Sequence, residues 1–213
     1  MDTKEIFEII VRSLYFALAG TALSMLTGVP LGMALGKRTG GISRTLAAFF
    51  GSLAAMPTVV MGLLLYLLLS RSGPLGALQW LYGSPGVIVG EFLLGLPIVV
   101  YHIYSGMKKI DSSLDETLRQ FGSSRLQSVF VFTYECLPLI AGAFVLSFGR
   151  TIGEVGLAMM IGGNIRHVTR TMTTAIALET AKGNVYDAIW LGLILMIIAL
   201  FINFAIQALQ KHE

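Results

Sequence analysis

Long apolar stretches without any charged side chain dominate the sequence. Three of them cover residues 13–36, 45–70 and 188–210. Each exceeds the roughly 20 helical residues that cross a hydrocarbon core about 30 Å thick. The pattern therefore predicts three membrane-spanning helices.

Two further apolar stretches carry isolated charges. Residues 86–106 include the carboxylate of Glu91, and residues 137–161 include Arg150 and Glu154. Charged residues within spans are rare and face the bundle interior or a water-filled path, so these stretches can still cross a membrane. We expect one all-α, polytopic membrane helix bundle over residues 1–213, with five spans at about 13–36, 45–70, 86–106, 137–161 and 188–210.

The composition supports a membrane protein and excludes several other classes. Of 213 residues, 55% are hydrophobic and 13% are charged, against about 25% charged residues in soluble domains. Five spans leave only short loops and no soluble catalytic domain. One cysteine and three scattered histidines have no metal-ligand spacing, and a net charge of +3 gives no support for nucleic-acid binding. We expect no metal, no cofactor and no nucleic-acid partner in this chain.

The basic residues predict an orientation in the membrane. They concentrate in the loops after the first and third spans and at the C-terminus: Lys37, Arg38, Arg44, Lys108, Lys109, Arg119, Arg125 and Lys211. On the other side of the membrane, basic residues are spread over longer stretches. An odd number of spans places the termini on opposite sides, so the positive-inside rule predicts an outside N-terminus and a cytoplasmic C-terminus.

The loop over residues 108–135 is too long for a plain connector. Its first half carries an apolar stripe at helical spacing: Ile110, Leu114, Leu118 and Phe121. Ser113 and Glu116 have the spacing of a capping box, and Gly122 is placed to end the helix. The stripe indicates a short surface helix, which could equally lie on the lipid interface.

The same loop resembles a conserved loop of ABC-importer permease subunits. Glu116-Thr117-Leu118, followed by Gly122 and later by Leu137-Pro138, is similar to the EAA…G…LP loop of that family. Here the two alanines are replaced, and the Leu-Pro pair lies farther from the glycine than usual. The resemblance implies a coupling helix that docks on an ATPase subunit, with candidate residues Ser113, Glu116, Thr117, Leu118, Gly122 and Arg125.

A second segment narrows the resemblance to one group of ABC-importer permeases. The sequences GRTIGEVG at residues 149–156 and MMIGGNI at residues 159–165 resemble tungstate-type permeases and, less closely, molybdate- and sulfate-type permeases. With the order of the spans, the resemblance covers essentially the whole chain. It implies the MetI-like core of a type I ABC importer, a homodimer in the inner membrane of a prokaryotic cell. It also implies two ATPase subunits that bind ATP and Mg²⁺ on the cytoplasmic side and an extracytoplasmic oxyanion-binding protein.

Arg150 and Glu154 are the charged pair within the fourth expected span. They lie four residues apart, a spacing at which helical side chains can pair. The pair could be a structural ion pair that supports a kink between Gly149 and Gly153. Alternatively, Arg150 could line the pathway and supply positive potential to a passing dianion.

The stretch over residues 162–186 is expected to form an external loop or gate region. A flexible break at Gly162-Gly163-Asn164 precedes a short helix over residues 169–182, closed by Gly183. Candidate pathway or gate residues are Arg150, Glu154, Met159, Met160, Asn164, Arg166 and Arg170. Plain packing would also explain the methionines, and a solvated surface would explain the two later arginines.

The chain has no nucleotide-binding loop of the GxxxxGK[ST] form, and it has no hydrolase or zinc-protease motif. We therefore expect a transport subunit that is not an enzyme and whose ATP is hydrolysed by partners. The leading hypothesis is a permease of an oxyanion importer, most simply for tungstate. A molybdate or sulfate permease, a passive anion channel and a non-transporting membrane scaffold or enzyme are the alternatives.

Overall fold

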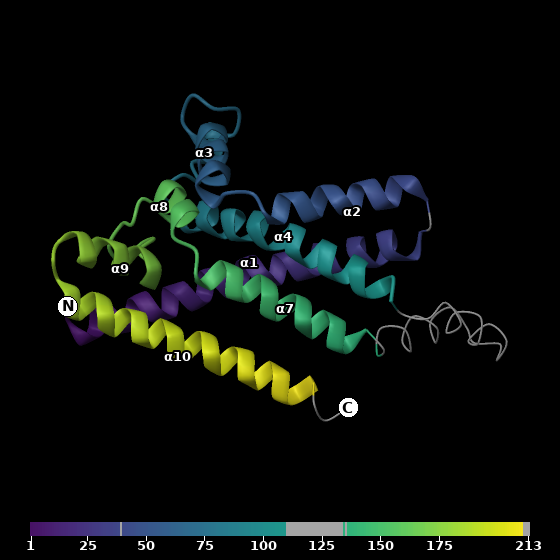
Figure 1. The fold of residues 1–213 in the computed structure, drawn as a ribbon. Coiled ribbons are helices and arrows are strands. Elements are labelled where there is room, and N and C mark those ends of the chain that lie inside the picture. The colour runs from purple at the N-terminus through teal and green to yellow at the C-terminus, as the bar shows by residue number, and fades with distance from the viewer. Residues whose placement is uncertain (39, 110–133, 135, 211–213) are drawn as a thin grey trace.

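The described part of the chain consists of helices joined by short connections (Figure 1). The computed structural model describes residues 1–38, 40–109, 134 and 136–210. Among these residues there is no strand, and the predicted all-α class is confirmed. The helices are α1 (Thr3–Lys37), α2 (Gly41–Ala54), α3 (Thr58–Leu69), the 3₁₀ turn η1 (Gly76–Leu78), α4 (Ser84–Met107), α7 (Leu137–Ile152), α8 (Gly156–Gly162), α9 (Met172–Ala181) and α10 (Val185–Gln210).

Three of these helices, α1, α4 and α10, are long and apolar enough to cross a membrane. The other two expected spans are each divided into a bent pair of helices. The axes of α2 and α3 differ by 98°, and those of α7 and α8 differ by 61°. The described chain therefore has three candidate spans, or up to five when each bent pair is counted as one.

The expected span over residues 45–70 is thus two helices. Pro57, the residue before α3, has the extended backbone angles φ −60° and ψ 126°. A proline disfavours helical geometry in the residue before it and has no N–H for the helical ladder, so α2 ends just before this position. The fourth span breaks at residues 153–155, slightly beyond the expected kink between Gly149 and Gly153.

Glycines hold α1 close to α4. Gly28, Gly32 and Gly36 of α1 face Val99, Ile103 and Met107 of α4, respectively. A methyl group added to Gly32 would lie 2.8 Å from Ile103 Cβ and 2.9 Å from the Val100 carbonyl oxygen. This glycine ladder therefore serves packing within the chain, which is the use of small residues expected between membrane helices.

Two buried clusters fix the other helices around the α1–α4 pair. One joins α1, α7, α9 and α10 through residues such as Ile9, Phe148, Met172 and Leu191. The other joins α3, α4 and α8 through Leu65, Leu94, Leu157 and Ile161. The N-terminus, α8, α9 and the start of α10 lie at one end of the bundle, which we call the N-terminal end (Figure 1).

The predicted external helix is present in a shorter form. It begins after Thr171, whose side-chain oxygen caps the Thr174 N–H, and it ends at Ala181. Gly183 then adopts a φ of +80°, a left-handed conformation that glycine accepts at little cost. The six candidate coupling residues, from Ser113 to Arg125, lie outside the described residues.

Candidate functional site

Arg150 and Glu154 form an ion pair across the break between α7 and α8. Arg150 lies in the last turn of α7, and Glu154 follows the capping residue Gly153. Arg150 Nη1 donates to Glu154 Oε2 over 3.0 Å. The arginine side chain is 37% exposed, whereas that of Glu154 is 2% exposed. Arg150 is therefore the more exposed member of this pair.

Glu154 also ties the break to two neighbouring helices. Its Oε1 accepts the Leu157 N–H in the first turn of α8, over 2.9 Å. Its backbone oxygen accepts the hydroxyl of Thr173 from α9, over 2.6 Å. Because all three groups converge on one residue of the break, Glu154 couples the direction of α7 to the positions of α8 and α9.

The fold adds Glu91 of α4 to this site. Glu91 is 3% exposed, and Gly95, one turn further along α4, faces Ser147, one turn before Arg150 on α7. Its neighbour Gly90 packs against the side chain of Leu157, the residue whose N–H binds Glu154. In the sequence, Glu91 lies about 60 residues before Arg150 and Glu154. The antiparallel packing of α4 on α7 and α8 brings the three residues to the same part of the bundle.

The two candidate gate methionines have different surroundings. Met160 packs on Gly62 of α3, where a methyl group would lie 3.3 Å from Met160 Cβ. Met159 is 39% exposed, so its side chain remains at the surface of the described chain. The contact with α3 accounts for Met160 as packing, and a gate role for Met159 stays a prediction.

The remaining gate candidates form a charged cluster at the N-terminal end. Arg166 donates from Nε and Nη2 to both carboxylate oxygens of Glu5, over 2.8 and 2.7 Å. Arg170 Nη1 donates to Glu5 Oε1 over 3.2 Å, and Arg170 Nε donates to Asn164 Oδ1 over 3.2 Å. Asn164 Nδ2 in turn donates to the Thr174 carbonyl oxygen, over 3.3 Å. The three residues are thus held to α1 and α9 by bonds within the chain.

Glu5 is the residue that sequence reasoning missed. Its single carboxylate binds both Arg166 and Arg170, two of the candidate gate residues. A signal was present in the sequence, since Glu5, Glu8 and Arg12 recur at intervals of three and four and share one face of the helix ahead of the apolar stretch. Such a face predicts that another part of the chain pairs with it. It does not identify Arg166 and Arg170, which lie more than 150 positions further along the sequence.

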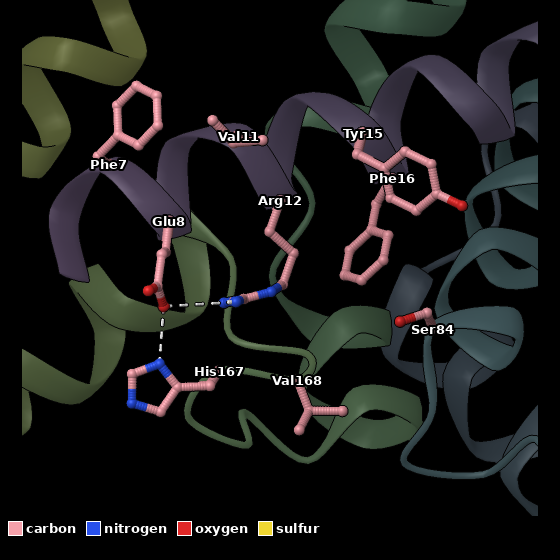
Figure 2. A pocket seen from close by; sticks show the side chains of 9 residues that line it. All are labelled: Phe7, Glu8, Val11, Arg12, Tyr15, Phe16, Ser84, His167 and Val168. Atoms are coloured by element: carbon pink, nitrogen blue, oxygen red, sulfur yellow. Dashed lines mark hydrogen bonds and ion pairs between the residues drawn. The ribbon is translucent and has the colours of Figure 1, made fainter. Parts of the chain in front are cut away.

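A hollow of about 470 Å³ lies beside this cluster, between the first turns of α1 and residues 167–168 (Figure 2). Its polar lining is paired internally: His167 Nδ1 lies 2.7 Å from Glu8 Oε2, and Arg12 Nη2 lies 4.0 Å from the same oxygen. Ser84 and mostly apolar side chains form the rest of the wall: Phe7, Val11, Tyr15, Phe16 and Val168. The hollow therefore offers an apolar surface with few unpaired polar groups.

No group of three or more potential metal ligands occurs among the residues that the structure describes. The site with the most distinctive chemistry is therefore the buried one at the α7–α8 break. There the exposed side of an arginine and a buried carboxylate meet at a point where the helical hydrogen-bond ladder is interrupted.

Comparisons with known proteins agree with this description. Residues 28–212 match the family model described as "Binding-protein-dependent transport system inner membrane component". The tungstate uptake system permease protein TupB of Peptoclostridium acidaminophilum is 33% identical over 98% of this chain and 91% of that protein. TupB of Campylobacter jejuni is 39% identical over 74% of this chain and 66% of its own length.

The fold has a close counterpart among solved structures. The whole chain superposes on 99% of a chain in an inward-facing structure of the MetNI methionine ABC transporter, with a TM-score of 0.78 and 17% identity. At that identity the likeness concerns the fold alone. Taken with the match over residues 28–212, it shows that this chain belongs to the binding-protein-dependent transport system inner membrane component family, the multi-pass permease subunits of ABC importers.

Proposed function

We propose that this chain is the permease subunit of an ATP-driven importer for tungstate. The similarity to two tungstate uptake permeases, one of which aligns with nearly the whole chain, carries the proposal. The half-exposed Arg150 suits the cargo, because a guanidinium beside a water-filled path attracts a tetrahedral dianion. Its pairing with Glu154 keeps that attraction weak, as conduction requires.

The proposed assembly contains two copies of this chain and two ATPase subunits. The ATPase subunits bind ATP and Mg²⁺ and dock on the loop over residues 108–135, whose candidate coupling residues are Glu116 and Gly122. An extracytoplasmic oxyanion-binding protein delivers the cargo at the N-terminal end, where Asn164, Arg166 and Arg170 form a gate region. This arrangement places the N-terminus outside and the C-terminus in the cytoplasm.

The test is purification of the tagged chain from its native membrane in a gentle detergent, followed by intact-complex mass measurement. The proposal predicts two permeases with two ATPase subunits, and ATP hydrolysis that rises with the tungstate-loaded binding protein. Stimulation by molybdate or sulfate but not tungstate would assign the complex to one of the alternative cargoes. A chain that purifies alone and conducts anions without ATP would show a passive channel and overturn the proposal.

A further inference from the structure

Glu91 is a buried carboxyl group that lacks a full set of partners. It lies in α4, is 3% exposed, and its Oε2 has no hydrogen-bond partner among the described residues. Leaving an ionised carboxylate buried and incompletely paired is costly, and such groups commonly take up a proton instead. The surroundings of Glu91 decide whether a counter-charge removes this cost.

On α1, the residue that meets Glu91 is neutral. Gly20 contacts the Cβ of Glu91, and the neighbouring Thr21 binds Thr151 of α7 through its hydroxyl, over 3.2 Å. One turn further along, Ser24 donates to the carbonyl oxygens of Gly20 and Phe92. The hydroxyls on the α1 side are thus already engaged, and none of them donates to Glu91.

The arginine at the level of Glu91 is already committed. On α4, Gly95 lies one turn after Glu91 and faces Ser147, which lies one turn before Arg150 on α7, but Arg150 Nη1 donates to Glu154 over 3.0 Å. Glu154 is therefore a second carboxylate on the same side. With both carboxyl groups ionised, one positive charge would face two negative charges, and the cluster would carry a net charge of about −1.

We infer that Glu91 is a proton-binding site, and that its proton keeps the Glu91, Arg150 and Glu154 cluster neutral while an oxyanion passes. The proton is taken from water and returned to water, and the only bond that forms or breaks is an O–H bond of the carboxyl group. Loss of the proton makes the cluster negative beside the path of a dianion, so it slows transport. The effect of this proton on transport rests on the proposed function. Proton binding by Glu91 does not depend on that function.

Other groups on α4 and the neighbouring helices lie far from Glu91, do not titrate near neutral pH, or already belong to the cluster. His102 of α4 lies about three helical turns away and faces Gly142 of α7. Gly20, the residue of α1 that meets Glu91, and the neighbouring Thr21 and Ser24 do not titrate near neutral pH. Arg150 and Glu154 are the charged residues of α7, α8 and the break between them, and both belong to the cluster.

The direct test is infrared spectroscopy of the purified complex at neutral pH, which detects the carbonyl stretch of a protonated carboxylic acid. Glu91→Gln keeps the shape of the side chain and cannot bind the proton. We expect one protonated-carboxyl band that is lost in Glu91→Gln and kept in Ser147→Ala, which alters the other unpartnered buried polar atom. Identical bands in the wild type and Glu91→Gln would refute the assignment, whether or not the complex transports tungstate.

The functional test compares tungstate-stimulated ATP hydrolysis from about pH 6 to pH 9, a range that covers documented buried carboxyl groups. Above the midpoint, the protonated fraction of Glu91 falls about tenfold per pH unit, and we expect stimulation in the wild type to fall with it. Glu91→Gln should remove that decline, and Ser147→Ala should retain it. The same decline in all three proteins contradicts a transport role for the proton, whereas no stimulation at any pH contradicts the proposed function instead.

Discussion

At the scale of single residues, three of the four buried carboxylates of the described chain have bonding partners. Glu5, Glu154 and Glu179 each have side chains that are at most 10% exposed, and each accepts bonds from cations or amides. The Glu5 pairs join segments far apart in the sequence, whereas Glu154 and Glu179 bind residues three to five positions away. Single substitutions at these carboxylates therefore test how the ends of the helices are held.

Replacing Glu5 by glutamine should loosen the N-terminal end. The change removes the charge that holds Arg166, which is 59% exposed, and Arg170, which is 14% exposed. Because exposed pairs contribute little, the cost comes mainly from Arg170, and we expect a loss of about 1–2 kcal/mol. Thermal unfolding in mild detergent measures it. The exposed Lys4 supplies a control, since Lys4→Gln changes the charge of the same helix end and should leave the transition in place.

Acid should weaken one contact of α9. Hydrogen bonds from Asn184 and then Lys182 lower the pKa of Glu179 below its ordinary value. A carboxyl group with a lowered pKa in the folded state contributes stability above its unfolded pKa, and this contribution is lost as the pH falls through the folded pKa. Asn184→Ala should therefore be less stable than the wild type at neutral pH, and the difference should shrink in acid.

Melting temperatures of both proteins at a series of acidic pH values measure this effect. Thr180→Ala is a matched control, because the exposed Thr180 hydroxyl bonds only the backbone oxygen of Ile176. Its effect should not depend on pH. A gap between Asn184→Ala and the wild type that stays constant into acid would mean that the amide does not act through the Glu179 carboxyl.

At the scale of helices, close approach at glycines and breaks within two expected spans shape the bundle. The glycine ladder of α1 lets α4 lie against it, and the bends after α2 and α7 turn two expected spans into bent pairs. Periodicity and charge-free length predict where α1, α4 and α10 lie. They do not give the 98° bend, because Pro57 signals a break but the direction of the next helix depends on packing against α8.

Gly32→Ala should separate α1 from α4. The added methyl group meets Ile103 Cβ at 2.8 Å and the backbone oxygen of Val100 at 2.9 Å, and a backbone atom cannot rotate aside. We expect about 1–3 kcal/mol of destabilisation, the usual cost of overpacking. In Gly192→Ala of α10, the methyl group meets nothing within 4 Å. Equal melting temperatures for Gly32→Ala and Gly192→Ala would show that α1 and α4 are not tightly packed at Gly32.

At the scale of the whole molecule, the family and the fold could be predicted from sequence, but the arrangement of the site could not. The motif at residues 149–156 identifies Arg150 and Glu154, yet Glu91 joins them only through the packing of α4. Likewise, Arg166 and Arg170 look like free cations in the sequence, whereas the fold gives them Glu5 as a partner. Local sequence patterns do not predict contacts between segments that lie far apart in the sequence.

Substitutions in the loop over residues 108–135 should uncouple the complex. If Glu116 and Gly122 contact the ATPase subunits, Glu116→Ala and Gly122→Leu should lower transport per ATP hydrolysed and leave the melting temperature of the bundle unchanged. Uptake and hydrolysis are measured in the same vesicles. Gly192→Ala of α10, outside this loop, serves as the control, because the added methyl group meets nothing within 4 Å. Normal coupling in Glu116→Ala and Gly122→Leu would refute the assignment of these residues to contact with the ATPase subunits.

The most direct test of the central claim is uptake of radioactive tungstate into proteoliposomes that contain the purified complex, with ATP inside and the loaded binding protein outside. We predict accumulation that requires ATP, the binding protein and both subunits together. Tungstate entry that proceeds without ATP, or no accumulation when every component is present, would contradict the assignment of this chain as a tungstate importer permease.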